Sequence, residues 1–523
     1  MPMPSAHRAR RRAPTLGFAL GLAACSLTAC EHARSERPDA ALDAAEPMGT
    51  GEDAAGMHTA HDATPTADAG SPDADASAEE PIPEPDASVE VGATFADLNP
   101  AYLFDQTKVR TFELYLSKED LAKLDADPAA EEYVPGRMAF EGGLLEDVGI
   151  RYKGSTGSFL FCVAGGFFPP SGPKTCVKLG MKIKIDYVDD DARFYRQKKI
   201  QFHALNLDAS LLRERFGYGL FNAMGVHAPR TAHVRMVVNG KFIGLFLLVE
   251  VIDSPFTRER FVDGGEGNLY KEVWPVTHDE AHYLAALETN RKDQPSAAKM
   301  VALADALSTA RDQDLPALVE HWMDPDYVAR FIAIDRALRH DDGPHHWYCQ
   351  DAQSPPLGDW HAQRSYAGMS CGNHNYFWYE STQAEQLWPI PWDLDNSLLG
   401  GGNFTSLLSD WDDLGVDCTA LLTPSFGPPQ MPITCDALHR GLALSLPSRV
   451  RDALEALAAG PLSEAELEAR FAPWLSQLEP LVAEANAAGL SEPPLESWQS
   501  SVAGLRQAIS LLREQALAHA RGE

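Results

Sequence analysis

The chain has 523 residues, of which 45% are hydrophobic, and it carries a formal net charge of −31 at pH 7. This length is enough for several average domains or for one large α/β unit, and the hydrophobic content is ordinary for a globular protein. Because nucleic-acid backbones bind to basic surfaces, the acidic balance argues against a nucleic-acid partner.

Residues 1–30 have the pattern of a bacterial export signal. A basic run at 7–12 precedes an apolar run at 16–22, which is too short to span a bilayer as a mature helix. Cys25 and Cys30 both follow small residues and resemble the acylated cysteine of a lipoprotein. We favour Cys30, since Cys25 follows the apolar run unusually closely; an ordinary signal peptide is the alternative. Acylation would anchor the protein to a membrane surface of the bacterial cell envelope, outside the cytoplasm.

Residues 31–93 form an acidic linker rich in Ala, Asp and Pro. A segment with so little apolar surface cannot offset the entropy lost on folding, so we expect it to be disordered. Its charge should keep it extended as a spacer between the membrane and the folded part. Much of the negative charge of the chain therefore belongs to this tether.

The first half of the folded part is rich in strand patterns. Alternating apolar residues predict strands at 109–116, 148–152 and 181–187. The clearest hairpin joins 233–238 to 241–251, because Asn-Gly between two β-rich runs is the strongest short hairpin signal. We therefore expect an antiparallel sheet here.

Helical periodicity becomes dominant later in the chain. The expected helices are residues 211–224, 327–339, 444–458, 464–488 and 498–520. Ser463 and Glu466 form a capping box at the start of one of them. Strands followed by mixed elements and then by helices indicate an α+β fold. We assign 94–440 to its core and 441–523 to a helical C-terminal part of the same domain.

Six further cysteines lie in three neighbouring pairs. An exported chain sits in an oxidising compartment, so three local disulfides are the simplest interpretation, although other connectivities remain formally possible. No CxxC-type cluster indicates a zinc site. The expected disulfides are Cys162–Cys176, Cys349–Cys371 and Cys418–Cys435.

Two buried strands near residue 380 end in a pair of acids. The patterns cover 375–379 and 388–392, and the second strand runs directly into Asp393 and Asp395. Carboxylates two residues apart at a strand end suit Mg²⁺ or Mn²⁺, and a metal would neutralise charge that is costly to bury. The alternative is that Asp393 caps a turn and Asp395 begins the next loop.

Other charged residues complete the set of groups that a phosphoryl-transfer site needs. Such a site uses a lysine on the phosphates, a glutamate that fixes the lysine, an aspartate that receives the hydroxyl proton, and Asn and Asp oxygens on the metal. The candidates are Lys178, Lys182, Lys184, Glu250, Asp341, Asp342, Asn375, Asp393 and Asp395.

An ordered series of motifs resembles the CotH kinases, a family of atypical secreted protein kinases first named from a bacterial spore-coat protein. Each motif is weak alone, but the series is specific and covers the chain from about residue 95 to its end. The matching segments are Arg151-Tyr152-Lys153-Gly154-Ser155, 178–184, 205–208, Arg213-Glu214, 225–230, 238–246, 267–271, 374–377 and 391–395.

The resemblance implies an atypical kinase-like fold, ATP and Mg²⁺ or Mn²⁺ as cofactors, and a role for each motif residue. Lys178 is the closest match to the phosphate-binding lysine, with Lys182 and Lys184 as alternatives. Arg151 and Glu250 belong to the nucleotide site in this comparison. The catalytic aspartate would be Asp342, with Asp341 as the competing choice. The metal would be held by Asn375 and Asp395, with Asp393 as a second ligand or a support.

Two inserts depart from the family pattern. About thirty residues separate Asp342 from Asn375, where the family has only a few, and this insert carries Cys349 and Cys371. A disulfide between them would fold the insert out and bring its ends together. A second insert at 159–175 is bounded by cysteines in the same way. The inserts could equally signal altered substrate choice or lost activity.

The leading hypothesis is an exported, lipid-anchored ATP-dependent kinase that phosphorylates Ser or Thr on secreted or surface proteins. A catalytically inactive surface scaffold or adhesin is the first alternative. A metal-dependent glycosyltransferase that uses Asp393 and Asp395 as a DxD pair is the second, and the surrounding motifs do not favour it.

Overall fold

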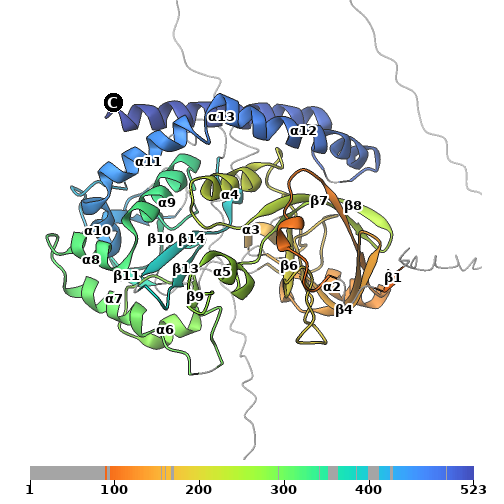
Figure 1. Cartoon of the computed structure of the whole chain (residues 1–523), viewed down its shortest axis with the longest axis horizontal. Helices are drawn as coiled ribbons and strands as arrows, with labels where there is room; N and C mark the ends of the chain where they lie inside the picture. The colour runs from red at the N-terminus through yellow and green to blue at the C-terminus, as the bar shows by residue number, and fades with distance from the viewer. Residues whose placement is uncertain are drawn as a thin grey trace, which may run out of the picture. The chain divides into compact units, whose positions relative to one another are not determined.

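The computed structural model describes the residues 89–90, 95–154, 156–159, 161–165, 170–292, 294–340, 342–351, 363–384, 386–398, 411–423, 428–490 and 492–522 (Figure 1). The expected export signal, Cys25, Cys30, Asp341 and all but two residues of the expected linker lie outside this set. All of the described residues fall in one compact unit.

The largest sheet has eight strands in the order β1-β4-β3-β2-β7-β8-β6-β5, and a further pairing of β5 with β4 closes it on itself. The pairs β1–β4 and β2–β7 are parallel, so the sheet is mixed, whereas we expected an antiparallel one. Its strands are β1 (Val89–Glu90), β2 (Arg110–Tyr115), β3 (Val134–Phe140), β4 (Gly143–Tyr152), β5 (Met181–Lys184), β6 (Lys199–His203), β7 (Thr231–Val238) and β8 (Lys241–Val249).

The expected hairpin is confirmed as β7 and β8. Asn239 and Gly240 both have positive φ, 49° and 75°, which is the conformation that a tight turn between twisted strands requires. Most residues of the hairpin are buried on both faces, and exposure is confined mainly to its turn end. It therefore forms a rigid wall of the closed sheet.

The two faces of β4, β5 and β6 differ sharply. Tyr152, Met181 and Phe202 are paired across the three strands and belong to one buried apolar cluster. The opposite face carries cations, because residues paired directly across a sheet share a face and side chains alternate along each strand. This cationic face consists of Arg151, Lys153, Lys182, Lys184 and Lys199.

A second layer packs helices around a three-stranded sheet. The central strand β13 (Tyr376–Glu380) is buried at every residue between β9 (Asn268–Lys271) and β14 (Leu387–Pro391). Helix α9 (Pro325–Leu338) contacts β14, and α4 (Arg213–Ala223) contacts α9. The remaining helices before β14 are α2 (Lys118–Ala126), α3 (Thr156–Phe159), α5 (Ser254–Arg260), α6 (Glu280–Ala285), α7 (Ala298–Thr309) and α8 (Leu315–Trp322).

The C-terminal helices tie the two layers together. Helix α12 (Glu464–Ala487) lies beside α13 (Leu495–Ala520) and also contacts β8, while α13 contacts α9 (Figure 1). The expected helix at 444–458 is instead divided into α10 (Ala437–Ser445) and α11 (Pro447–Ala459), because Pro447 begins a new helix. Ser463 accepts from the backbone amide of Glu466, as the capping pattern predicted.

The three expected disulfides are confirmed: Cys162–Cys176, Cys349–Cys371 and Cys418–Cys435. The second one joins opposed residues of β10 (Trp347–Asp351) and β12 (Met369–Gly372) in a small sheet with β11 (Arg364–Tyr366) and β15 (Gln430–Met431). The described part of the insert between Asp342 and Asn375 thus contains three paired strands, β10, β11 and β12, and a disulfide joins β10 to β12. In the described part of the chain, no helix is long and apolar enough to cross a membrane.

Candidate functional site

Two carboxylates stand in the turn that follows β14. Asp393 has a left-handed backbone conformation with φ of 52°, and Asp395 lies in the 3₁₀ turn η3 (Leu394–Asn396). The Asp393 amide donates to the hydroxyl of Tyr218 on α4 at 2.9 Å, and the Asp393 carbonyl accepts from His340 Nε2 at 3.0 Å. Groups from α4 and from the end of α9 therefore hold the acidic turn in place.

The negative charge of this turn is poorly compensated. Burial raises the pKa of Asp393, and the carboxylate of Glu214 raises it further. Burial and the charge of Asp393 raise the pKa of Asp395 well above its ordinary value. Carboxylates that repel one another in a low dielectric bind hard divalent cations well, because the cation removes the repulsion. The turn is therefore a good candidate for a metal site.

Glu214 is the third acid of the site, and the sequence analysis did not assign it a role. It lies in the first turn of α4 and is only 1% exposed. One ligand atom each from His203, Glu214 and Asp393 lie within 4.8 Å of one another, so the three residues can share a metal ion. Glu214 could have been noticed in the sequence as an acid in the first turn of an otherwise buried helix. No comparable sequence pattern indicates His203.

Asp342 lies beside the acidic turn and is bound by three side chains. Its carboxylate is 2.7 Å from His374 Nε2 and accepts from Asn375 Nδ2 at 3.0 Å and from Asn396 Nδ2 at 3.3 Å. Burial opposes ionisation, but the charge of His374 prevails and lowers the pKa of Asp342. The same pair raises the pKa of His374 to about 9 against the effect of burial. Asp342 is therefore an ionised acceptor.

The structure brings Asp342 and Asn375 together although a long insert separates them in sequence. Asn375 Nδ2 also donates to the Asp342 carbonyl at 2.9 Å, and Asn373 Nδ2 donates to the carbonyl of Pro344 at 2.8 Å. These bonds close the base of the insert just beyond the disulfide between β10 and β12. The insert thus leaves the geometry of the site intact.

The cationic face of the closed sheet approaches the acids through Lys153. Burial lowers the pKa of Lys153, whereas the nearby charges of Asp393 and Glu214 raise it. Burial and the positive charges of Lys153 and Lys199 lower the pKa of Lys182 to about 7. Lys182 has no hydrogen bond or ion pair with any residue that the structure describes, and the nearby charge of Asp253 only partly offsets the lowering of its pKa. A half-buried cation that lies among other cations and has no ion pair indicates a site for an anionic ligand.

The site is built from residues in a fixed chain order. Lysines on the sheet come first, a buried glutamate on α4 follows, and aspartates come after α9 and after β14. A family model described as CotH kinase protein matches residues 150–511, which is more than half of the chain. The chain belongs to the CotH kinase family. No curated protein matches the chain. Membership in the CotH family suggests a kinase-like phosphotransferase, and it generally implies dependence on a nucleotide and a divalent metal.

Lys178, the lysine that best matches the CotH motif, is paired with a residue near the C-terminal helices in this CotH family member. Its ammonium group donates to Glu492 Oε1 at 2.6 Å and to the carbonyl of Leu245 at 2.9 Å, and the side chain is 3% exposed. Glu492 comes from the segment between α12 and α13 and also accepts from the Leu245 amide. Lys178 therefore fastens the C-terminal helices to the sheet.

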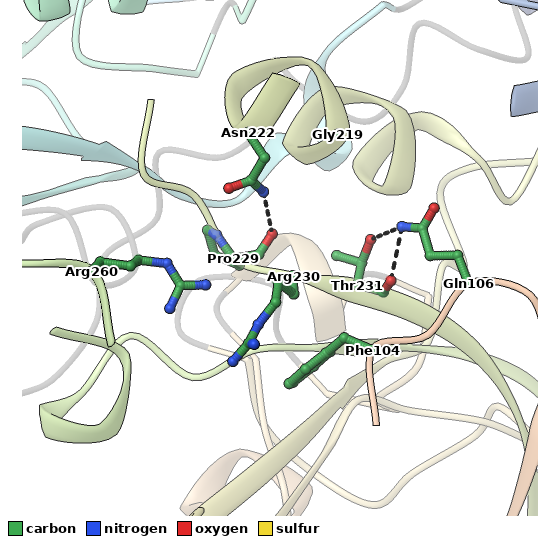
Figure 2. Close-up of a pocket in the computed structure, with 8 residues that line it drawn as sticks. All are labelled: Phe104, Gln106, Gly219, Asn222, Pro229, Arg230, Thr231 and Arg260. Carbon is green, nitrogen blue, oxygen red and sulfur yellow. Dashed lines mark hydrogen bonds between the residues drawn. The ribbon is translucent and has the colours of Figure 1, made fainter. Parts of the chain in front are cut away.

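Glu250, which the CotH resemblance placed near the nucleotide, is bound by two arginines. Arg230 donates to it through the backbone amide at 3.0 Å and through the guanidinium, and Arg260 donates to both oxygens. Figure 2 shows the same guanidiniums reaching into a pocket of about 390 Å³. The pocket is lined by Phe104, Gln106, Gly219, Asn222, Pro229, Arg230, Thr231 and Arg260. Its charges are already paired, so Glu250 fixes this corner of the fold.

A buried acid behind the acidic turn orients two histidines of the CotH fold. Asp335 on α9 is 3.1 Å from His340 Nδ1 and 2.7 Å from His345 Nδ1. Burial opposes the effect, but the hydrogen bond to Asp335 raises the pKa of His340. His340 in turn bonds to the backbone carbonyl of Asp393, so Asp335 on α9 helps to fix the backbone of the acidic turn.

Proposed function

We propose that the protein is a metal-dependent kinase that transfers the γ-phosphate of ATP to Ser or Thr hydroxyls of secreted or surface proteins. The observation that carries this proposal is the unpaired Lys182, which lies beside Lys153 at the edge of a carboxylate cluster. A metal–triphosphate complex has the matching pattern, since its phosphates need cations and its metal needs oxygen ligands. Membership in the CotH family supports the same reaction class.

Each end of the site has a defined task in this mechanism. Lys153 and Lys182 bind phosphate oxygens; Arg151 lies directly opposite Lys182 on the same face and forms an ion pair with Glu131. Asp393, Asp395 and Glu214 would hold Mg²⁺ or Mn²⁺, whose charge offsets that of the phosphates. The Asn375 carbonyl accepts from the amide of Trp392, next to Asp393, and its side chain donates to Asp342. The acceptor hydroxyl oxygen forms a bond to the γ-phosphorus as the bond to the β–γ bridging oxygen breaks. Asp342 orients that hydroxyl and receives its proton.

The arrangement of Asp342 suits orientation more than proton abstraction. Three donors hold its carboxylate, and its pKa is below the ordinary value. Phosphoryl transfer proceeds through a loose transition state in most analyses, so the hydroxyl loses its proton late and needs no strong base. Positioning and charge compensation then supply most of the rate enhancement.

We also propose that the protein is exported and held at the bacterial cell envelope by lipid on Cys30 or Cys25. The three disulfides support export, because such bonds persist in oxidising compartments. The acidic linker would then place the kinase at a distance from the membrane. Mass spectrometry of the mature N-terminus from cells tests the anchor and decides between the two cysteines.

The test of the proposed activity uses the oxidised full chain with γ-labelled ATP and Mg²⁺ or Mn²⁺. We expect label on the protein itself or on a Ser-rich acceptor protein, and a loss of at least about 100-fold in Asp395→Asn, since that change removes a charged metal ligand. The matched control is Asp97→Asn, an exposed acid far from the site in sequence. Transfer that persists in Asp395→Asn contradicts the metal assignment. No transfer by the intact folded protein favours the scaffold.

A further inference from the structure

His203 lies between Lys153, the cation assigned to phosphate, and Glu214, an acid assigned to the metal. Its Nε2 lies 2.9 Å from Nζ of Lys153, and its Nδ1 lies 2.9 Å from both carboxylate oxygens of Glu214. An ammonium group can only donate, so the contacts assign the acceptor role to Nε2 and the ring proton to Nδ1. Lys153, His203 and Glu214 thus form a continuous chain of hydrogen bonds.

Three independent parts of the fold fix this chain. His203 is the last residue of β6, Lys153 follows β4 on the same face of the sheet, and Glu214 lies on α4. The imidazole packs edge-on against Trp392, with ring centroids 5.7 Å apart and planes at 90°, and Lys153 Nζ lies 5.5 Å from the centre of the same ring. The imidazole therefore has a defined place between the two charges.

A direct contact between the lysine and the acids would compete with metal binding. Lys153 is close enough to Asp393 and Glu214 for both charges to act on it. In ordinary protein kinases a lysine and a helix glutamate pair directly, and that glutamate does not need to bind metal. Here Glu214 is one of the residues that could hold the metal ion, so an ammonium group bound to its oxygens would occupy positions that the metal needs.

We propose that His203 is a positioning residue that spaces Lys153 from the carboxylates, which leaves Glu214 and Asp393 for the metal and the ammonium group for phosphate. This inference rests on the proposed function, which requires both ligands. The hydrogen bond from Nδ1 also orients Glu214 and leaves lone pairs for coordination, as supporting residues commonly do at metal sites.

The test measures Mn²⁺ binding without nucleotide, by electron paramagnetic resonance titration of the oxidised full chain. The variants are His203→Ala, His203→Gln, Lys153→Met and the double variant Lys153→Met/His203→Ala. We expect His203→Ala to weaken Mn²⁺ binding about tenfold, because the freed ammonium group moves onto the carboxylates. His203→Gln should stay within about threefold, since an amide can accept from Lys153 and donate to Glu214.

The double variant separates spacing from direct ligation. If His203 acts through Lys153, the His203→Ala change loses most of its effect once Lys153 is Met. An undiminished loss in that background, or an equal loss in His203→Gln, means that His203 is itself a metal ligand and overturns the proposal. Wild-type affinity in His203→Ala, or no Mn²⁺ binding by the wild type, overturns it as well. Phosphate transfer on the same samples is scored separately, so a metal pattern as expected without transfer refutes only the kinase activity.

Discussion

Two lysines four residues apart in one motif have opposite environments. Lys178 is 2% exposed and paired with Glu492 and a backbone carbonyl. Lys182 is half-buried; the cations Lys153, Lys199 and Arg151 and one acid, Asp253, act on its charge, and it has no hydrogen bond or ion pair among the described residues. The first has the contacts of a structural residue, and the second has the environment of a residue that binds an anionic ligand. Sequence spacing could not distinguish them; their partners do.

The largest expected effect concerns the structural role of Lys178. We expect Lys178→Met to lower the free energy of unfolding by about 3–5 kcal/mol, because it leaves Glu492 buried without a counter-charge. Urea unfolding measures the effect. In Lys178→Met/Glu492→Gln most of the loss should return, since the amide oxygen can still accept from the Leu245 backbone amide. A loss below about 1 kcal/mol in the single variant would show that the pair is not structural.

The opposite result is expected at Lys182. Lys182→Met should reduce phosphate transfer about 100-fold, because a cation that faces developing phosphate charge is lost. The free energy of unfolding should stay the same or rise, since the variant removes the repulsion between Lys182 and the neighbouring cations. Initial rates and urea unfolding measure the two effects, with the exposed Lys108→Met as the control. An unchanged rate would place the phosphate lysine elsewhere.

The pH dependence of nucleotide binding sharpens the comparison further. The pKa of Lys182 is lowered to about 7 from 10.5, and phosphate favours the charged form. Below pH 7 the lysine is already charged. Above pH 7 binding must take up a proton, so the affinity for ATP should fall by up to about tenfold per pH unit. Calorimetry across pH 6–9 tests this, and Lys182→Arg, which stays charged, should remove the trend. The same trend in Lys182→Arg would assign it to another group.

Local patterns predicted much of the fold. The Asn239-Gly240 turn, the Ser463 cap and the spacing of the cysteines each depend on neighbours in sequence, and the structure confirms all of them. The parallel pairing of β2 with β7 was missed, because strand order depends on contacts across more than a hundred residues. The break at Pro447 was visible in the sequence but was placed inside a longer helical pattern.

The candidate site was predicted less evenly. The acids after β14 could be predicted from the sequence, since two carboxylates at the end of an apolar strand need a partner. The role of Lys178 could not be predicted, because its partner Glu492 lies 314 residues away. Lys153, His203 and Glu214 meet only because β4, β6 and α4 converge, which no single segment indicates. Contacts between segments far apart in the sequence thus decide which residues of a motif belong to the candidate site.

The most direct measurement is a calorimetric titration of MgATP into the wild type, Lys182→Met and Lys178→Met/Glu492→Gln. We predict binding by the wild type and by the double variant with similar affinity, and a loss of at least about tenfold in Lys182→Met. Equal binding by all three proteins, or binding lost only in the double variant, would contradict the assignment of the unpaired lysine to the nucleotide phosphates.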